Sequence, residues 1–357
     1  MKRLFLLFGL LVLFAESLWA KGDPMDRPLM VGPQYPFVYM STTFEPDRAF
    51  NLSAGQSFWQ FGQIRLNTQT FSPSAYRNDD FNETAAGFHD LSDQGYSVYF
   101  DGEIDRQIAR YYKGLTDGVE FQLTYRKLRV IKGTLDRQIE SFHKSLGLDN
   151  QNRDKLERDQ MGIYIMDNET DTIVYQVSQP SDKFHQESMT LGFKFRIRET
   201  QNEAIALVVS SNFGDNYIEK QMNESTADGK EFRNFNDRNF ALIYSSLWPD
   251  WSLHSGFSFA DTKSSLFKNS PKEIYYFFLG FNFHLGQHSD WLLQGLDYSS
   301  PYPENAISNI NDDIREVSTG LRWHWSWGGY EMGLIENTSQ GQQNIDIALF
   351  SNFMFSF

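Results

Sequence analysis

Hydrophobic and polar residues alternate one by one along many short stretches of this chain. In the stretch 188–199, Phe193 and Phe195 fall on one face, whereas Lys194 and Arg196 fall on the other. A period of two is typical of a β-strand whose two faces meet different surroundings. The pattern predicts strands at residues 57–68, 95–112, 119–131, 160–167, 172–179, 188–199, 204–213, 239–248, 251–260, 273–285, 290–298, 315–326, 329–337 and 345–357.

The connections between these strands alternate in length. An up-and-down transmembrane barrel with both chain ends in the periplasm has short turns at one end and longer external loops at the other, whereas a soluble β-sandwich has no reason to alternate. We therefore predict an all-β fold, a transmembrane antiparallel up-and-down β-barrel of about 14 strands, with 12 or 16 strands as alternatives. The short connections are 113–118, 168–171, 200–203, 249–250, 286–289 and 327–328, and the long ones are 69–94, 132–159, 180–187, 214–238, 261–272, 299–314 and 338–344.

The first predicted strand changes its apolar face partway along. Trp59 and Phe61 lie on one face, and Ile64 and Leu66 continue the pattern on the other. We interpret this change as a β-bulge, because one extra residue shifts the alternation of side chains.

The start of the chain predicts export. Lys2 and Arg3 precede an apolar run at 4–14, and the small residue Ala20 ends the segment. This is the layout of a secretory signal peptide, so we assign residues 1–20 to one. The alternative is an N-terminal membrane anchor, for which the apolar run is short.

The end of the chain predicts the outer membrane. The stretch 345–357 alternates, and its aromatic face ends with Phe353, Phe355 and Phe357. A final aromatic strand that closes on Phe resembles the signal that the barrel assembly machinery reads. We therefore expect this machinery as a partner and the bacterial outer membrane as the location.

The composition narrows the class of protein further. The 357 residues include 16% aromatic residues and no Cys, and the net charge is -14. After residue 20 no apolar run approaches the roughly 20 residues of a membrane-spanning helix, which excludes a polytopic helical protein. The lack of Cys excludes a disulfide framework and a thiolate metal site, and the negative charge disfavours nucleic acid as a partner. We expect no cofactor and no metal.

Residues 21–56, called the arm below, precede the barrel at 57–357. The arm contains five prolines, which exclude a central strand. Two interpretations stay open: the arm is a plug folded into the lumen, or it is a periplasmic tail packed on the barrel rim.

One segment, 134–148, has apolar residues at helical spacing instead of strand spacing. Thr134 can cap the N-terminus of this helix, and Gly147 suits the position after its C-terminus. The loop lengths assign the helix to the external loop 132–159. There it covers the mouth as a lid, lies on the lipopolysaccharide surface, or only covers the rim. The apolar positions are Leu135, Ile139, Phe142 and Leu146.

The helix carries a resemblance to a known family. Residues 133–148, followed by Arg153, are similar to the pattern L-D-x-x-I-E-x-F-H-x-x-x-G-L with a later Arg, found in a family of Gram-negative outer-membrane barrels of unknown function. Residues 28–49 resemble the same family. The turn at 112–120 also resembles barrels grouped with aromatic-hydrocarbon channels. The resemblance implies the fold and the location, and it supplies no activity.

The same pattern suggests binding residues. We expect Asp136, Glu140 and His143, with Arg153 after the helix, to contact a ligand or a partner. His143 cannot serve as the base for Ser145, because residues two apart on a helix point about 200° apart. Two carboxylates and one imidazole are also too few to predict a metal site.

Charged residues on the inward faces of the strands provide a second set of candidates. Such charges either pair with one another and close the lumen, or line a pore and set its selectivity. The predicted lumen residues are Arg126, Lys194, Arg196, His254, His284, Arg322 and His324.

Together these features predict a passive channel for a small apolar or amphipathic molecule. A 14-stranded barrel with an N-terminal plug resembles the uptake channels for fatty acids and hydrocarbons. The alternatives are a lipid-active outer-membrane hydrolase and a closed barrel with a structural role in the envelope. Besides the assembly machinery, the expected partners are outer-membrane lipid, lipopolysaccharide and a small hydrophobic ligand.

Overall fold

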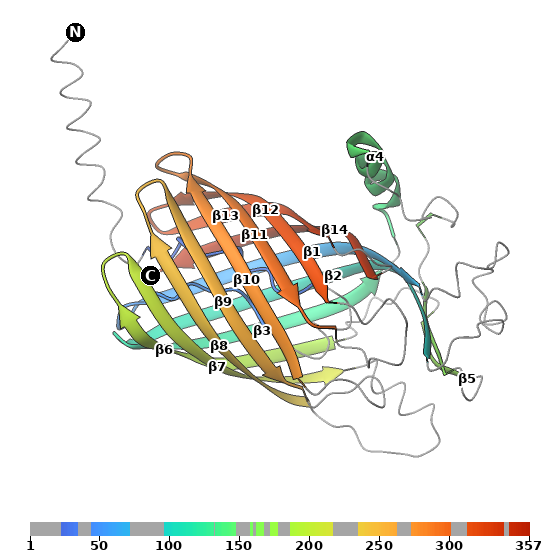
Figure 1. Cartoon of the computed structure of the whole chain (residues 1–357), viewed down its shortest axis with the longest axis horizontal. Coiled ribbons are helices and arrows are strands. Elements are labelled where there is room, and N and C mark those ends of the chain that lie inside the picture. The colour runs from blue at the N-terminus through green and yellow to red at the C-terminus, as the bar shows by residue number, and fades with distance from the viewer. Residues whose placement is uncertain are drawn as a thin grey trace, which may run out of the picture.

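The computed structural model contains an antiparallel β-barrel whose sheet closes on itself (Figure 1). The predicted signal peptide lies outside the residues that the structure describes. These residues are 23–34, 44–71, 96–131, 133–147, 158–159, 162–167, 172–177, 186–216, 235–262, 273–300, 313–338 and 343–357.

Twelve strands form the barrel wall, and each pairs with two antiparallel neighbours. The wall closes because the first strand pairs with both the second and the last strand. The wall strands are β1 (Ser57–Phe71), β2 (Tyr96–Thr116), β3 (Val119–Ile131), β6 (Gln186–Glu199), β7 (Glu203–Asn216), β8 (Phe235–Leu247), β9 (Trp251–Asp261), β10 (Glu273–His284), β11 (Ser289–Tyr298), β12 (Ile314–Trp325), β13 (Gly328–Asn337) and β14 (Gln343–Ser356).

The predicted antiparallel β-barrel is confirmed, but its wall has twelve strands, the lower predicted alternative, and not about 14, although every predicted strand is present. The strands β4 (Gly162–Asp167) and β5 (Thr172–Val177) form a hairpin, and β4 pairs with Tyr96–Asp101 of β2. The pairing of β2 with β3 begins only at Glu103 and Ile131, so the start of β2 extends past β3 and pairs with β4 instead. Alternation identifies a strand but not its pairing partner, so the sequence could not separate this hairpin from the wall.

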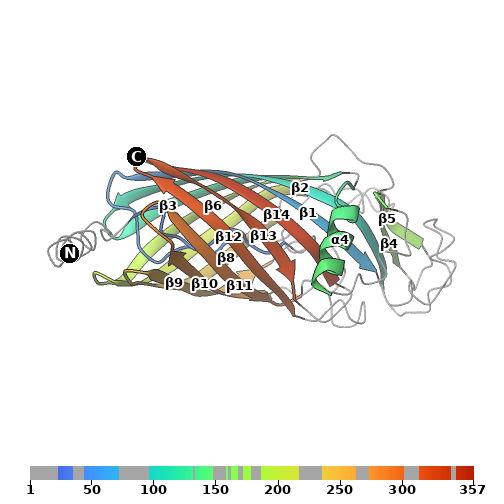
Figure 2. The same ribbon diagram turned by 90° about the horizontal axis from the view of Figure 1, so that it is seen from above.

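The described short connections lie together at one end of the barrel (Figure 2). We call the end with the connections 117–118, 200–202, 248–250, 285–288 and 326–327 the turn end, and the opposite end the loop end. The hairpin of β4 and β5 lies at the loop end, because β4 pairs with the start of β2. The prediction of a turn-end connection between these two strands was therefore wrong.

The outer face of the wall is apolar. Phe193 and Phe195 of β6 are 42% and 39% exposed, whereas Lys194 between them is completely buried. In β14, Phe353 faces outward and Asn352 is buried. An apolar outer face and a polar inner face are typical of barrels surrounded by lipid.

The three aromatic residues predicted as an assembly signal lie at or near the turn end of β14. The ring of Phe355 stacks on Trp327 with 5.9 Å between centroids, and Phe353 packs on Tyr330 at 4.7 Å. Phe357 is 72% exposed, and its backbone exchanges two hydrogen bonds with the first residue of β1. The last residue therefore helps to close the barrel, and its role in assembly stays a prediction.

The bulge predicted in the first strand is not at the predicted place. The pairing of β1 with β2 is continuous, and the irregularity in its pairing with β14 falls between Asn67 and Thr68. Ile64 and Leu66 are completely buried because they face the lumen, which is apolar at this level. Two different apolar faces, and not a bulge, explain the change of pattern.

The helix α4 (Asp136–Leu146) lies against the outside of the wall at the loop end (Figures 1 and 2). It ends at Leu146, and the left-handed φ of 69° at Gly147 confirms the residue predicted to follow its C-terminus. The predicted cap by the Thr134 side chain was wrong, since the backbone N–H groups of Thr134 and Leu135 donate to the Glu103 carboxylate of β2. Among the described residues, no helix is long and apolar enough to cross a membrane.

Candidate functional site

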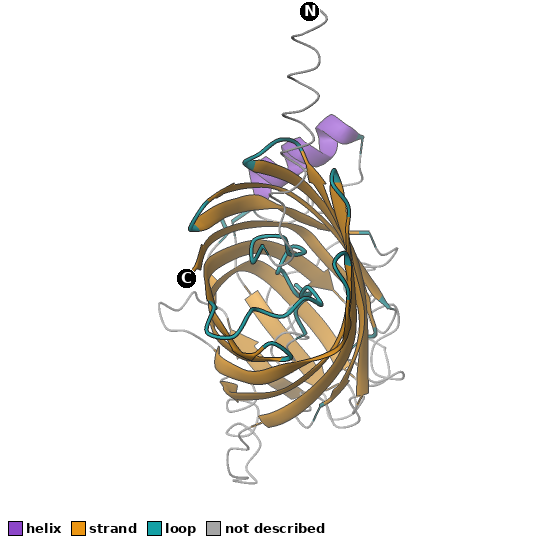
Figure 3. Cartoon of the chain, turned by 90° about the vertical axis from the view of Figure 1, so that its left-hand side faces the viewer, coloured by secondary structure: helices purple, strands orange, loops and turns teal. Residues whose placement is uncertain are grey.

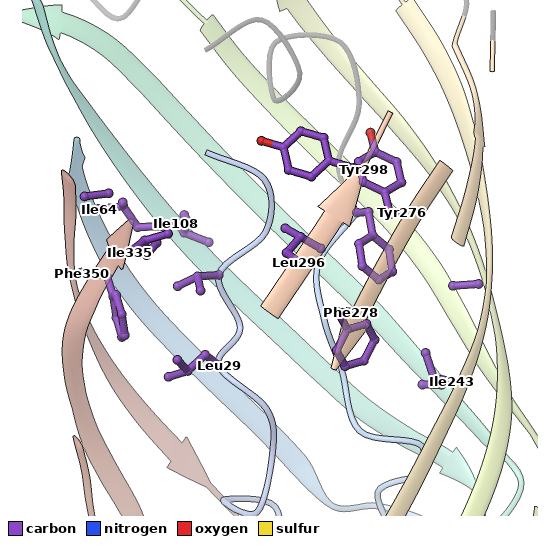
Figure 4. Close-up of a cluster of buried hydrophobic side chains, with 14 of the residues drawn as sticks. Leu29, Ile64, Ile108, Ile243, Tyr276, Phe278, Leu296, Tyr298, Ile335 and Phe350 are labelled. Atoms are coloured by element: carbon purple, nitrogen blue, oxygen red, sulfur yellow. The ribbon is translucent and has the colours of Figure 1, made fainter. Parts of the chain in front are cut away.

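The inner face of the wall changes character along the barrel axis. Toward the loop end, the inward side chains of β10 to β14 and of β1 to β3 are mainly apolar, and toward the turn end they are mainly polar or charged. Figure 4 shows part of the apolar group. That group includes Ile64, Ile108, Tyr276, Phe278, Leu296, Tyr298, Ile335 and Phe350, and the polar group includes Gln60, Arg110, Glu120, Lys194, Asn282, Arg322, Glu331 and Asn352.

The arm residues 23–34 and 44–52 run through the lumen (Figure 3), and residues 53–55 are exposed beside the turn end of β2. Leu29 and Phe44 belong to the same buried apolar cluster as the loop-end wall residues. The ring of Phe44 stacks on Tyr276 of β10 with 5.4 Å between centroids. The arm therefore contributes side chains to the core that fills the barrel.

Gly32 lets the two described parts of the arm approach each other closely. A Cβ atom at Gly32 would clash with the backbone carbonyl oxygen of Phe44. Any larger residue at this position would push the two parts apart, so the fold of the arm inside the lumen depends on this glycine.

Three arginines of the wall converge on one carboxylate of the arm. Arg110 Nη2 lies 2.6 Å from Glu45 Oε2, and Arg126 Nε and Arg106 Nη2 lie 3.0 Å and 3.3 Å from Glu45 Oε1. Arg106 and Arg110 come from β2, and Arg126 comes from β3. All four side chains are buried, which strengthens the attraction between their charges.

The arginines hold Glu45 in its charged form. Burial by itself raises the pKa of this carboxyl, but the charges of Arg110, Arg126 and Arg106 outweigh it and lower the pKa from 4.5 to about 2. The carboxylate is therefore ionised at neutral pH although its side chain is almost completely buried.

A second ion cluster lies beside the first. Asp47 of the arm pairs with Arg27 of the arm and, at 3.1 Å, with Lys194 Nζ of β6. Lys194 Nζ also lies 2.9 Å from Glu120 Oε1, and Gln122 Nε2 donates to Asp47 Oδ2 at 2.7 Å. These contacts connect both described parts of the arm to β3 and β6.

A third group of contacts holds the start of the arm. Arg322 of β12 donates to the carbonyl oxygens of Met25 and Arg27, at 2.7 Å and 2.8 Å. Its Nη2 also lies 2.6 Å from Glu331 Oε2 of β13. The wall pair therefore orients a guanidinium that binds the backbone of the arm.

A small cavity remains between the arm and the wall formed by β3, β6, β7 and β8. Its volume is about 40 Å³, which is room for only a few water molecules. Its lining includes Glu45, Arg126, Thr190, Ser210 and Asn239. An organic solute does not fit into this cavity while the arm is in place.

Ser245, His254 and Asp26 form a group that the sequence did not suggest. Ser245 Oγ lies 2.8 Å from His254 Nδ1, and His254 Nε2 lies 3.5 Å from Asp26 Oδ1. Serine, histidine and aspartate are the residue types of an acyl-transfer site. However, Ser245 and His254 are completely buried, and Ser245 Oγ accepts a hydrogen bond from the backbone N–H of Ala49. The group therefore binds the arm to the wall.

The structure places most of the predicted lumen residues inside the barrel. Arg126, Lys194, His254, Arg322 and His324 are buried on the inner face. Each of them has a polar or charged partner in the arm or in the wall.

The two remaining predicted lumen residues lie at the turn end. His284 Nδ1 lies 2.8 Å from Asp290 Oδ1. Arg196 is exposed and pairs with Glu199 at 3.6 Å, and its strand partner Ala206 is buried, so its predicted role in lining the lumen stays a prediction. A register shift after Arg196 ends the regular inward alternation of β6.

The turn end also brings histidines together. Asp290 lies between His284 and His324, whose Nε2 is 3.6 Å from Asp290 Oδ2. Within the described ranges, no group of three or more His, Cys, Asp or Glu side chains could hold a metal ion.

The residues predicted to bind a ligand on the helix attach α4 to its surroundings. Asp136 accepts hydrogen bonds from Asn67 Nδ2 of β1 and from the Asp159 backbone. Glu140 forms two hydrogen bonds with Arg158. The third residue, His143, is buried, with its Nε2 3.9 Å from a carboxylate oxygen of Glu336 in β13. The fourth predicted residue, Arg153, lies outside the described residues.

The acidic residues of the arm were missed at the sequence level. Glu45 and Asp47 flank Pro46 in a segment with no strand or helix pattern, so no periodicity assigned their side chains to a face. The available signal was charge: the inward faces carry several arginines and lysines, and buried charges require partners.

A closed barrel with an apolar outer face and its own N-terminal segment in the lumen has the fold of the outer-membrane β-barrels. The chain belongs to the family described as "Protein of unknown function (DUF3187)", which matches residues 10–357. This confirms the expected membership in a family of unknown function whose fold is that of outer-membrane barrels.

Solved structures of outer-membrane barrels resemble the fold. An outer membrane channel from Pseudomonas putida F1 matches with a TM-score of 0.50 and 8% identity, over 88% of this chain and 100% of that chain. The NanC porin matches with a TM-score of 0.41 and 8% identity, over 83% and 98%. The toluene transporter TodX from Pseudomonas putida matches with a TM-score of 0.35 and 8% identity, over 87% and 98%. The search of curated proteins found no match.

Proposed function

We propose that this protein is a channel of the bacterial outer membrane and that its arm closes the lumen in the conformation described above. The observation that carries the proposal is the arm inside a twelve-stranded wall. A barrel of eight strands fills its interior with its own side chains, whereas wider barrels enclose cavities or channels. Here a segment that is not part of the wall fills the lumen. A passage would therefore open when this segment moves.

The contacts between the arm and the wall support such a movement. The backbone N–H groups of Gln34 and Leu52 donate to carboxylates of the wall, at 2.9 Å and 2.8 Å, and that of Ala49 donates to a serine hydroxyl. These bonds involve wall side chains, so breaking them leaves the backbone hydrogen bonds between the wall strands intact. The part of the arm before Gly55 can therefore leave its position without opening the barrel wall, whereas Gly55 and Gln56 keep their backbone hydrogen bonds to Gly114 of β2.

The lining of the lumen supports an apolar or amphipathic solute. The walls of β10 to β14 and of β1 to β3 present large apolar side chains at the loop end, as described above. The opposite wall of β6 to β9 presents small polar residues there, including Thr190, Asn212, Asn239 and Ser258. A solute with one apolar and one polar side would contact both walls.

The outer face supports a location in a membrane. Large aromatic side chains face outward from many strands, and two of the charges on this face, Glu273 and Arg315, lie at strand ends at the loop end. An apolar band of this kind is typical of barrels that cross the outer membrane. Together with the predicted signal peptide, this supports export to the bacterial outer membrane.

A reversible lock tests the channel. The backbone N of Ala49 lies 2.8 Å from Ser245 Oγ, and the chain has no Cys of its own. We would replace both residues with Cys in the full-length protein and measure ion currents across planar bilayers before and after reduction. We expect closed barrels while the disulfide is present, and currents after reduction; Ala49→Cys alone should not respond to reductant. Absence of current in every state would contradict the channel.

A further inference from the structure

We propose that Arg106, Arg110 and Arg126 form the solute-binding site of this channel, and that they select a small amphipathic molecule with one carboxylate. In the closed conformation, the carboxylate of Glu45 occupies this site. The inference rests on the proposed function, because the solute reaches the arginines only when the arm moves.

The site is built by the wall and does not depend on Glu45 alone. Arg110 also donates to Gln60 Oε1 and to the Met30 carbonyl oxygen, each at 2.7 Å. Arg126 Nη1 donates to Thr190 Oγ1 at 2.8 Å. The bonds to Gln60 and Thr190 come from neighbouring wall strands, so they keep two of the three guanidinium groups in place after the arm has moved.

The charge of the site requires an anion. Glu45 is the carboxylate that all three arginines share. If the arm withdraws this carboxylate, the three guanidinium groups lose the anion that they share while they remain close together. Uncompensated buried charges of one sign are strongly unfavourable, so the open state is stabilised by any anion that takes the place of Glu45. A planar guanidinium matches the geometry of a carboxylate particularly well.

The surroundings of the site require an apolar body on the same molecule. Ile104 and Ile108 alternate with Arg106 and Arg110 along the inner face of β2, and Leu128 follows Arg126 on β3. In the closed conformation, the buried side chains of the arm pack against this cluster. When the arm leaves, an apolar group next to the bound carboxylate would cover the same surface, which an inorganic anion cannot do.

The first test uses the unmodified protein and asks whether a ligand displaces the arm. The folded full-length barrel is treated with protease in the presence of benzoate, toluene, benzylamine or inorganic phosphate, and cleavage within the arm is followed by mass spectrometry. We expect benzoate to accelerate cleavage severalfold with a saturable dependence on concentration, and the other three probes to have a much smaller effect. Equal effects of benzoate and benzylamine, or of benzoate and phosphate, would overturn the inference.

The second test measures selectivity in bilayers. In Glu45→Gln, the site has lost its internal anion, and we expect benzoate to permeate at least tenfold better than benzylammonium, as judged from reversal potentials. Adding Arg110→Gln should reduce this preference severalfold. The matched control adds Glu187→Gln to Glu45→Gln. Glu187 is exposed on the outer face, so this substitution should leave the preference for benzoate unchanged.

The outcomes separate the two proposals. If Glu45→Gln conducts but passes benzoate and benzylammonium equally well, the selectivity is wrong and the channel stands. Folding of both variants is checked by the migration of the unheated barrel on a denaturing gel. If neither folded Glu45→Gln nor the folded, reduced Ala49→Cys/Ser245→Cys protein conducts, the proposal of a channel is wrong.

Discussion

Arg322 and Glu331 face each other across β12 and β13, and their side chains form an ion pair of 2.6 Å in the lumen. Both side chains are completely buried. The same guanidinium donates to two carbonyl oxygens at the start of the arm. A pair between two wall strands thus also binds the backbone of the arm near its start.

Removing this guanidinium should destabilise both the wall and the arm. In Arg322→Met, Glu331 remains buried without its cation, which typically costs about 3–5 kcal/mol. We expect the free energy of unfolding in urea to fall by roughly this amount, and the arm to become sensitive to protease under native conditions. Arg315→Gln is the control, because Arg315 and Asp297 form an exposed pair for which a change below about 1 kcal/mol is expected.

Acid should release the arm. The pKa of Glu45 is lowered from 4.5 to about 2, because the arginine charges outweigh the opposing effect of burial. A carboxyl whose pKa is lower when the arm is docked stabilises docking at pH above 4.5, and this contribution is lost as the pH falls toward 2. Cleavage of the arm by pepsin should therefore increase steeply over this range. In Glu45→Gln the dependence should be flatter but not abolished, because burial raises the pKa of Asp47 but the charges of Lys194 and Arg27 outweigh it and lower that pKa to about 2. An equally steep curve in this variant would assign the effect to groups other than Glu45.

The helix α4 should be dispensable for conduction. Asp136→Ala removes the hydrogen bonds from Asn67 and from the Asp159 backbone, and each loss should cost about 1–3 kcal/mol of local stability. We expect faster hydrogen exchange in α4, and unchanged bilayer currents in the reduced double-cysteine protein that carries this change. Arg137 lies on the exposed side of the helix, so Arg137→Ala should alter neither the hydrogen exchange of α4 nor the currents. A change in ion selectivity on replacing Asp136 would show that the helix contributes to the pore.

The wall between β12 and β13 should tolerate no side chain at Gly333. A Cβ atom there would clash with the Thr319 carbonyl oxygen and lie 2.6 Å from the Phe350 ring. Gly333→Ala should therefore reduce the free energy of unfolding by about 1–3 kcal/mol, as expected for overpacking. At Gly295 of β11 a Cβ would meet nothing within 4 Å, so Gly295→Ala should be nearly neutral in the same urea titration.

Much of the barrel could be predicted from the sequence because lipid and lumen act on alternate residues of the same strand. Phe193 and Phe195 had to face outward once Lys194 faced inward, and no knowledge of neighbouring strands was needed. The same local rule located the strands, and the preference of glycine for left-handed backbone located the end of the helix before Gly147. The count of wall strands failed because β4 has the pattern of a wall strand but pairs with an extension of β2.

Only the wall residues of the candidate site could be predicted from the sequence. The inward arginines and the lysine were identified from alternation, but their partners lie far away along the chain. Glu45 and Arg126 are separated by 81 positions, and nothing in the irregular segment around Glu45 indicates a direction for its side chain. The inward cations required anionic partners, but the sequence did not indicate which residues these are.

The sequence by itself determined the alternating strands, their two faces and the presence of an irregular arm before them, because these follow from interactions between near neighbours and their surroundings. Only the tertiary structure decided that twelve strands close the wall, that α4 lies outside it and that the arm fills the lumen. These outcomes depend on contacts between distant segments, such as Glu45 with its three arginines, and on the space that a closed wall leaves inside.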